Sequence, residues 1–307
     1  MKVLIVCSRN SGKIAPYIQE QGKALANSGI TVDFFAIKGK GFLGYLKNRK
    51  GLLDSIQRYM PDIIHAHYGL SGLLANTQLK VPVITTYHGS DINVRTIYLL
   101  SRLNMILSAH NIFVSEKNRQ KSDLARNQSL IPCGVDINLF QQINKVEARQ
   151  QLSLNADKKY ILFAGAFSNS VKNPNLAKSA VSFFQDTELI ELNGYSRHEV
   201  ALLLNAVDML LLTSFSEGSP QIIKEAMACN CPIVSVPVGD VEDVISGIAG
   251  CYISSYQLPD IVTKIKQAFA LGERTKGRNR IIEMGLDIDS ITQKIQNVYN
   301  KILSESK

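Results

Sequence analysis

The stretch MLLLTSFSEGSPQIIKEAMACNCPIVSVPVGD, residues 209–240, decides the fold class. It opens with a continuous apolar run, which predicts a strand buried on both faces. A helix-length segment follows at about 220–229, and CPIVSVP (231–237) is expected to be a second buried strand. A strand, a helix and a strand in this order form a βαβ unit, whose two strands lie parallel in one sheet.

The same alternation extends along the chain on both sides of this unit. Further strands are expected at 2–7, 31–37, 62–67, 81–88, 111–115, 160–167 and 187–193. Further helices are expected at 16–27, 43–60, 69–78, 93–108, 146–154, 174–184, 196–206, 257–271 and 287–305. Because the alternation breaks near residues 140–157, we predict an α/β protein of two Rossmann-like, doubly wound domains.

The expected domains are residues 1–156 and 157–307, and the last helix is left free to pack back on the first domain. Ligands of open parallel sheets bind outside the carboxyl ends of the strands. A protein of two such halves is therefore expected to hold its ligand in a cleft between them.

The charge of the chain is unevenly distributed. Of 307 residues, 45% are hydrophobic and 20% charged, and the net charge is +8. Residues 1–150 hold 19 lysines and arginines against 9 acidic residues, whereas the remainder holds 15 against 17. The first half is therefore expected to meet an anionic partner, for which nucleic acid, a membrane surface and a phosphorylated acceptor are candidates.

Compartment signals point to the cytosol. The run KVLIVC (2–7) is expected to be a strand and not a signal peptide, and no apolar stretch approaches the length of a membrane span. The five cysteines lie mostly in apolar runs, which is typical of reduced core thiols.

The segment around residue 220 carries the chemistry. Ser219 is expected to cap a helix whose first residue is Pro220, so that the amides of Ser219 and Gln221 form an anion site with the helix dipole. Glu217 and Glu225 would then accept hydrogen bonds from sugar hydroxyls on either side of a bound diphosphate. The alternative is a capped surface helix with ordinary glutamates, and the spacing alone does not separate the two.

The pattern E-G-S-P-x4-E-A-M-A-C (217–229) resembles the E-x7-E donor motif of retaining glycosyltransferases of family 4, which have the two-domain GT-B fold with a central cleft. Other segments resemble the family in order and position: PDIIHAHYG (61–69), TYHGSD (86–91), IPCGVDINLF (131–140), VKNP (171–174) and NAVDMLLLTS (205–214).

The resemblance implies roles for eight residues. It makes Glu217, which would hold the sugar ring, catalytic together with His88 and with Lys172, which would neutralise the leaving diphosphate. It implies donor binding by Gly12, Gly218, Ser219, Gln221 and Glu225, the last on the nucleotide ribose. One departure is Ala166, which stands where the family commonly has an arginine, so either another basic group substitutes, the donor geometry differs, or activity is reduced.

The sequence predicts that the protein uses neither a metal ion nor another cofactor. His65 and His67 share one side of a strand without an evident third ligand, and neither a P-loop nor a dinucleotide fingerprint is present. The basic and aromatic segment 38–53 is either a solvated loop and helix or a patch for anionic lipid headgroups. Nucleic-acid binding is not expected, because its aromatics fit no RNA-binding motif.

These observations together predict a cytoplasmic enzyme, peripheral on the inner face of the membrane through 38–53. It is expected to transfer a sugar from a UDP-, GDP- or ADP-sugar to a saccharide or lipid-linked acceptor, with retention, in bacterial surface polysaccharide synthesis. Two alternatives remain open: a nucleotide-sugar 2-epimerase of the same architecture, and a catalytically weak partner that binds sugar nucleotides.

Overall fold

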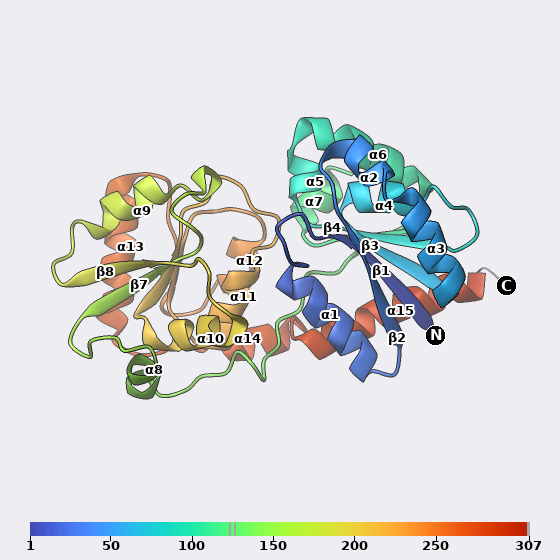
Figure 1. Ribbon diagram of the computed structural model, residues 1–307. Coiled ribbons are helices and arrows are strands. Elements are labelled where there is room, and N and C mark those ends of the chain that lie inside the picture. Colours follow the sequence, from blue (N-terminus) through green and yellow to red (C-terminus); the bar gives the residue numbers. More distant parts are fainter. Residues whose placement is uncertain (123, 126, 306–307) are drawn as a thin grey trace. The chain divides into compact units, whose positions relative to one another are not determined.

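The computed structural model describes residues 1–122, 124–125 and 127–305, which form two compact units. Unit 1 comprises Met1–Gly134 and the C-terminal helix that begins at Ile288, and unit 2 comprises Val135–Asp287 (Figure 1).

Unit 1 is built on a parallel sheet of order β2-β1-β3-β4-β5-β6. Its strands are β1 (Lys2–Ser8), β2 (Thr31–Ile37), β3 (Ile63–His67), β4 (Val83–Tyr87), β5 (His110–Phe113) and β6 (Gln128–Leu130). Its helices are α1 (Pro16–Asn27), α2 (Gly41–Leu46), α3 (Arg49–Tyr59), α4 (Gly69–Ala75), α5 (Ser90–Asn93), α6 (Arg95–Leu107), α7 (Glu116–Gln120) and α15 (Ile288–Glu305).

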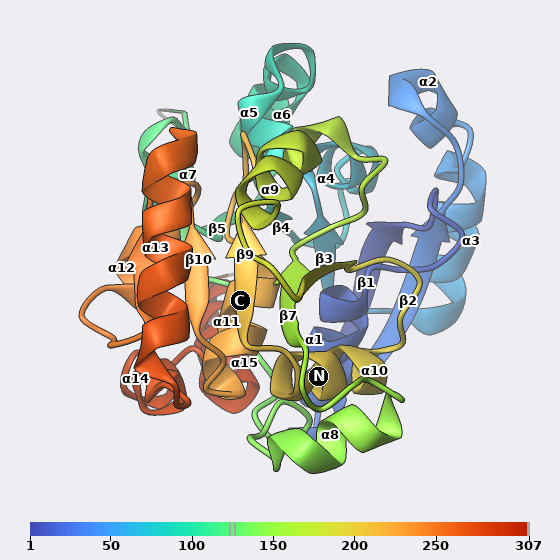
Figure 2. The ribbon, with the colours of Figure 1, turned by 90° about the vertical axis from the view of Figure 1, so that its left-hand side faces the viewer.

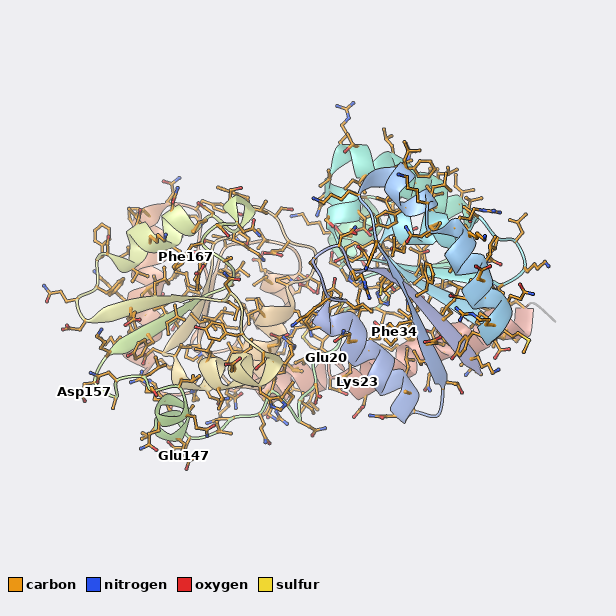
Figure 3. The ribbon with its side chains drawn as sticks, viewed as in Figure 1. Glu20, Lys23, Phe34, Glu147, Asp157 and Phe167 are labelled. Carbon is orange, nitrogen blue, oxygen red and sulfur yellow. The ribbon has the colours of Figure 1, made fainter. Side chains whose placement is uncertain are left out.

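The sheet of unit 1 is covered on both faces, which is why its central strands are apolar throughout. All residues of β3 and β4 are buried. Helices α1 and α15 lie together on one face, and α3, α4 and α6 lie on the other (Figures 1 and 2). Gly22 of α1 lies so close to the sheet that a Cβ there would be 2.3 Å from the ring of Phe34, which Figure 3 labels.

Unit 2 is a five-stranded parallel sheet of order β11-β10-β9-β7-β8. Its strands are β7 (Lys159–Phe163), β8 (Thr187–Glu191), β9 (Met209–Leu212), β10 (Ile233–Ser235) and β11 (Cys251–Ile253). Its helices are α8 (Lys145–Gln151), the 3₁₀ turn η1 (Ser170–Lys172), α9 (Pro174–Val181), α10 (Arg197–Ala206), α11 (Gln221–Ala228), α12 (Val241–Ile245), α13 (Leu258–Leu271) and α14 (Gly277–Glu283). Helices α9 and α13 pack together over one apolar cluster of this sheet.

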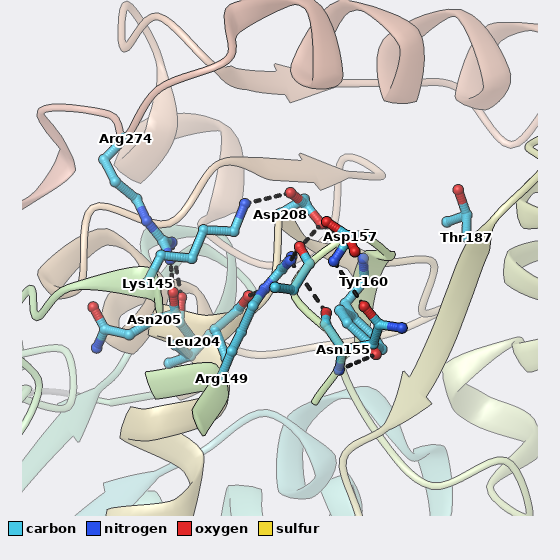
Figure 4. A network of polar contacts seen from close by, with 12 residues as sticks. Lys145, Arg149, Asn155, Asp157, Tyr160, Thr187, Leu204, Asn205, Asp208 and Arg274 are labelled. Atoms are coloured by element: carbon cyan, nitrogen blue, oxygen red, sulfur yellow. Dashed lines mark hydrogen bonds and ion pairs between the residues drawn. The ribbon is translucent and has the colours of Figure 1, made fainter. Parts of the chain in front are cut away.

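The boundary of the units differs from the predicted one at residue 156, because residues 135–156 pack with unit 2. In α8, Lys145 and Arg149 both form ion pairs with Asp208, which lies just before β9 (Figure 4). The Arg149 guanidinium also donates to the carbonyl of Ala206, and Asp208 accepts from the amide of Tyr160. The last helix packs on unit 1, where Tyr299 is completely buried.

One of the predicted helices is divided in the structure, because the segment expected at 43–60 forms α2 and α3. The segment expected at 93–108 forms α6, and the short helix α5 that precedes it was not predicted. The predicted strands also did not include β6 and β11, two three-residue strands at the edges of the sheets. Within the described residues, no helix combines the length and apolarity needed to cross a bilayer.

Candidate active site

The loop between β9 and α11 brings the predicted donor residues together in unit 2. Strand β9 ends at Leu212, and α11 begins at Gln221 with Pro220 as its N-cap residue. The prediction that Ser219 caps this helix is wrong, and so is the prediction that Pro220 is its first residue. No side chain caps α11, because the Ser219 hydroxyl is engaged elsewhere. The first amides of the helix keep the partial positive charge of a helix N-terminus.

Glu217, at the centre of this loop, forms an ion pair with Lys172. The Lys172 Nζ lies 2.6 Å from the Glu217 Oε1, and the two side chains are 24% and 14% exposed. Lys172 ends the turn η1, and Thr213 holds that turn by donating to the Lys172 carbonyl. A Cβ at Gly165 would lie 2.7 Å from the Lys172 Cγ, so glycine is needed where the lysine crosses the end of β7.

Glu225, the second carboxylate, is held by Arg197. It lies on the second turn of α11, is 2% exposed, and accepts a hydrogen bond of 2.5 Å from the Arg197 guanidinium. Arg197 begins α10 and lies over the ring of Phe140, 4.7 Å from its centroid. A nearly buried carboxylate bonded to a partly exposed guanidinium is suited to accepting hydrogen bonds from vicinal hydroxyls.

A third polar group lies beneath the loop. Lys224 is completely buried, and its Nζ donates to the Ser219 hydroxyl at 2.7 Å. That hydroxyl donates to the Asp240 Oδ2 at 2.5 Å. Burial raises the pKa of the Asp240 carboxyl, and the charge of Lys224 opposes the rise. A Cβ at Gly239 would lie 2.6 Å from the carbonyl oxygen of Gly218, so the two loops touch through glycine backbone.

His88 lies in a separate cluster, in unit 1, directly after β4. Its Nε2 is 2.9 Å from the His67 Nδ1, and its Nδ1 is 3.7 Å from the Cys133 Sγ. The rings of Tyr17 and Tyr68 flank it at centroid distances of 5.0 and 4.6 Å, and their hydroxyls are hydrogen bonded to each other. Burial raises the pKa of Tyr68 to about 12, so its hydroxyl is protonated at neutral pH.

Asp91 fixes the backbone beside His88. Its carboxylate accepts hydrogen bonds from the amides of His88 and Gly89 at 3.1 and 2.9 Å, and from the amide of Gly69 at 3.2 Å. Gly89 has a φ of +117°, and the chain turns sharply there directly after β4. Burial raises the pKa of Asp91 to about 6, although these amides oppose the rise. Asp91 itself lies within α5, so its carboxylate joins the turn after β4 to the first residue of α4.

His65 and His67 are not arranged as a metal site. The His65 Nδ1 is 2.6 Å from the Tyr299 hydroxyl and its Nε2 is 2.7 Å from the Thr86 hydroxyl, so both ring nitrogens are engaged. Burial lowers the pKa of His65 to about 3. Among the described residues, no group of three or more His, Cys, Asp or Glu side chains is placed to hold a metal ion.

The predicted site residues therefore fall into two groups. Unit 2 places Lys172, Glu217 and Glu225 near the start of α11, together with Gly218, Ser219 and Gln221. Unit 1 holds His88 and Gly12. Gly12 is exposed, follows β1 and has a φ of +91°, a conformation that favours glycine.

Family models match both halves of this chain. The model described as Glycosyltransferase Family 4 matches residues 2–139, and the model described as Glycosyl transferases group 1 matches residues 146–270. The chain belongs to glycosyltransferase family 4.

A curated relative of this family 4 chain is the putative teichuronic acid biosynthesis glycosyltransferase TuaC of Bacillus subtilis. The two are 23% identical over 215 residues, which are 60% of this chain and 55% of TuaC. The chain spans about half the length of the curated relatives it matches.

Solved structures show the fold of this family 4 member. Sucrose-phosphate synthase from Thermosynechococcus elongatus matches with a TM-score of 0.85 at 18% identity, over 99% of each chain. Alr3699/HepE of Anabaena, solved with UDP, matches with a TM-score of 0.78 at 15% identity, over 98% of this chain and 100% of that one. The chain has the GT-B fold of two parallel-sheet α/β domains.

Sequence reasoning missed four side chains that hold the site residues in place. They are Arg197 and Lys224 in unit 2, and Tyr17 and Tyr68 in unit 1. Only Lys224 left a signal, since a lysine between Ile223 and Glu225 interrupts the apolar face of a buried helix. Arg197, Tyr17 and Tyr68 contact residues that are distant in the sequence, so no local pattern indicates these contacts.

Proposed function

We propose that this protein transfers a sugar from a nucleotide diphosphate sugar to a saccharide or lipid-linked acceptor, with retention of the anomeric configuration. The observation that carries the proposal is the pair of carboxylates at α11, each bonded to its own cation: Glu217 to Lys172 and Glu225 to Arg197. This pairing supports the proposal because it holds two carboxylates near the positive N-terminus of a helix, where we assign them to sugar hydroxyls.

The donor is assigned to unit 2 in this proposal. Glu225 accepts hydrogen bonds from the ribose, and Glu217 accepts them from the transferred sugar. The diphosphate contacts Lys172 and the backbone at Gly218, Ser219 and Gln221. UDP-, GDP- and ADP-sugars are all candidates, and the likeness to a protein solved with UDP makes UDP the first to test.

The proposed chemistry needs no metal ion or other cofactor. The bond between the anomeric carbon and the diphosphate oxygen breaks while the acceptor oxygen bonds to that carbon from the same face. The acceptor proton passes to the departing diphosphate. Lys172 stabilises the negative charge that develops on the diphosphate. Closure around the donor would exclude water and suppress hydrolysis. His88 is assigned a catalytic role, and Gly12 is assigned to donor binding.

We assign the acceptor to a pathway of bacterial surface polysaccharide synthesis. TuaC, whose name places it in teichuronic acid biosynthesis, supports this class of pathway. An acceptor on a lipid carrier would require contact with the inner face of the membrane, and the segment 38–53 is proposed to provide it. Lys47, Arg49 and Lys50 of that segment are exposed.

Ligand-induced stabilisation identifies the nucleotide. Melting temperatures would be measured with UDP, GDP, ADP and their sugars. A ligand at one hundred times its dissociation constant adds about 2.7 kcal/mol to the free energy of unfolding. We expect one nucleotide to raise the melting temperature and the others to leave it nearly unchanged.

Two substitutions test the site. Glu217→Ala should abolish turnover and leave nucleotide affinity nearly unchanged, because Glu217 is assigned to the sugar. Glu225→Ala should weaken nucleotide binding roughly tenfold to hundredfold, because hydrogen bonds to a charged group contribute about 1.5–3 kcal/mol. Calorimetric titration and a donor-consumption assay measure these effects, with Glu147→Ala, on the outside of α8, as the control. Full activity of both site variants would refute the assignment.

Ala166 supports a second candidate, a sugar-nucleotide-binding protein with little turnover. Alanine stands where the family commonly has an arginine, so one of the two expected positive charges at the diphosphate is lost. Lys172 is the other cation assigned to the diphosphate. Binding of a nucleotide without transfer or slow hydrolysis of any donor would favour this candidate. Release of isomeric donor sugars without acceptor would instead indicate an epimerase.

A further inference from the structure

Helix α6 presents large aliphatic side chains to solvent. Leu99 is 62% exposed, Leu103 is 49% exposed and Ile106 is 59% exposed. Leu107 and Val94 are also exposed. Residues three and four apart in a helix lie on the same face, so Leu99, Leu103, Ile106 and Leu107 form one apolar stripe along α6.

The buried side of the same helix carries two polar residues beside Met105. Ser101 and Asn104 are completely buried. The Asn104 side-chain amide donates to the Thr85 hydroxyl at 3.1 Å and to the Tyr87 hydroxyl at 2.8 Å, and its carbonyl accepts from Asn76 at 2.8 Å. A surface helix of a water-soluble protein normally shows the reverse arrangement, with apolar residues inside and polar residues outside.

Helix α4 approaches this polar side closely through two glycines. A Cβ at Gly69 would lie 2.2 Å from the Ser101 hydroxyl, and a Cβ at Gly72 would lie 2.3 Å from the Asn104 amide. Glycines at a helix contact, buried polar side chains that join the helices, and aliphatic residues on the outside are typical of helices whose outer neighbour is lipid.

The charges around the apolar face are positive. From Ile92 to Ser115 the sequence contains no acidic residue, and it includes Arg95 and Arg102. An acidic residue flanks this stretch at each end. Asp91 is buried, and Glu116 forms an ion pair with Arg119 at 2.9 Å, so neither adds an unpaired negative charge to the surface beside α6.

Helix α2 is a second exposed apolar element at the same end of unit 1. It packs against α4, and both α2 and α6 reach the upper end of unit 1, where Figure 2 shows them apart from each other. Phe42 and Leu43 of α2 are 43% and 72% exposed. The stretch from Phe34 to Leu53 likewise contains no acidic residue.

We propose that the outer face of α6, together with α2, docks this protein on a bilayer that contains anionic lipid. Apolar side chains would enter the interface while Arg95, which is exposed, contacts headgroups. A second copy of the chain fits less well, because a twofold contact through this face would bring arginines of like charge together. The inference extends the membrane contact from 38–53 to α6, and vesicle binding tests it without reference to sugar transfer.

A tryptophan reporter provides the direct test, because the chain contains no tryptophan. Leu103→Trp would be placed in the full chain and mixed with phosphatidylcholine vesicles, with and without phosphatidylglycerol. We expect a blue-shifted emission and quenching by brominated lipid only with phosphatidylglycerol present. Phe183→Trp is the matched control, since Phe183 is 63% exposed in unit 2, and its emission should not change. Equal emission of the Leu103→Trp variant with and without vesicles would overturn the proposal.

A triple variant tests whether the apolar face is needed. L99Q/L103Q/I106Q should reduce the vesicle-bound fraction in flotation about tenfold, because each inserted side chain adds to the affinity. The control V146Q/F183Q/I282Q replaces three exposed apolar residues of unit 2 and should bind like the wild type. Equal loss in both triples would contradict the proposal. So would a wild-type dimer in sedimentation that becomes monomeric in the α6 variant without any vesicle binding, since the occupant would then be a second copy.

Discussion

Lys224 is a cation enclosed by unit 2 rather than presented to solvent. Its Nζ is linked through the Ser219 hydroxyl to Asp240, which belongs to the loop after β10. A buried charge is tolerated when it is paired and hydrogen bonded. The three residues together therefore hold the loop of Glu217 against its neighbour.

Lys224→Met should lower the free energy of unfolding by about 3 kcal/mol, because removing one member of a buried charge pair leaves the other without compensation. Asp240→Asn should also destabilise the protein. The double variant should lose less than the sum of the two single losses, which urea unfolding in a double-mutant cycle measures. Additive losses would show that the two charges are not coupled.

Asp91 makes stability depend on pH. Its pKa is about 6 in the folded protein against an ordinary value of 3.8, because the carboxyl is buried. The folded state therefore binds this proton more tightly than the unfolded chain, and the contribution to stability is lost as pH rises from about 4 to about 6.

Asp91→Asn removes this titration. The free energy of unfolding of the wild type minus that of the variant should fall by about 2 kcal/mol between pH 4 and pH 7. Chemical denaturation at several pH values gives this difference, in which the other titrating groups largely cancel. A difference that stays constant with pH would contradict the raised pKa.

Ser219 shows where residue-level prediction failed. A serine before a proline and an apolar helix has the local signature of an N-cap. Its hydroxyl instead meets Asp240, 21 residues further along the chain, and Lys224 from within the helix. Local sequence does not report such competition, and the contact of Arg197 with Glu225 escaped prediction for the same reason.

Secondary structure was predictable where burial is uniform. The central strands are continuous apolar runs, so their positions followed from the sequence. The edge strands β6 and β11 are three residues long and partly exposed, so they carry little pattern. The division between α2 and α3 arises at Asn48, whose side-chain amide donates to the carbonyls of Gly44 and Tyr45.

The close contact of α4 and α6 can be tested with two glycines of unit 1. Gly72→Ala should destabilise the protein by about 2 kcal/mol, because the added methyl would lie 2.3 Å from the Asn104 amide and 2.5 Å from the Thr85 hydroxyl. Gly51→Ala in α3 is the matched control. Its methyl would meet only the Phe35 ring at 3.7 Å, so the gain in helix propensity should stabilise by about 0.5–1 kcal/mol. Similar melting temperatures for the two variants would argue against tight packing at α4.

At the scale of the whole molecule, unit 1 is assembled from both ends of the chain. Helix α15 lies against α1, and its Tyr299 hydroxyl reaches His65 within the sheet. Ile295 and Ile302 of the same helix are buried. The polypeptide therefore passes from unit 1 to unit 2 and returns.

Ending the chain after Asp287 should destabilise unit 1 selectively, because the face of the sheet under α15 would be exposed. Hydrogen exchange should show faster exchange in β1 and β3, with protection retained in β7 and β9. Ending the chain after Leu303 is the control and should preserve both patterns. Equal loss of protection in the two units would show that they unfold as one.

The return of the chain also sets the order of folding during translation. The half that the ribosome produces first remains incomplete until α15 has been synthesised, whereas unit 2 is complete in sequence before that helix is made. Domains made during synthesis generally fold from the N-terminus onward. Here a later segment completes an earlier one, so a premature stop codon just before α15 would damage the N-terminal half of the product.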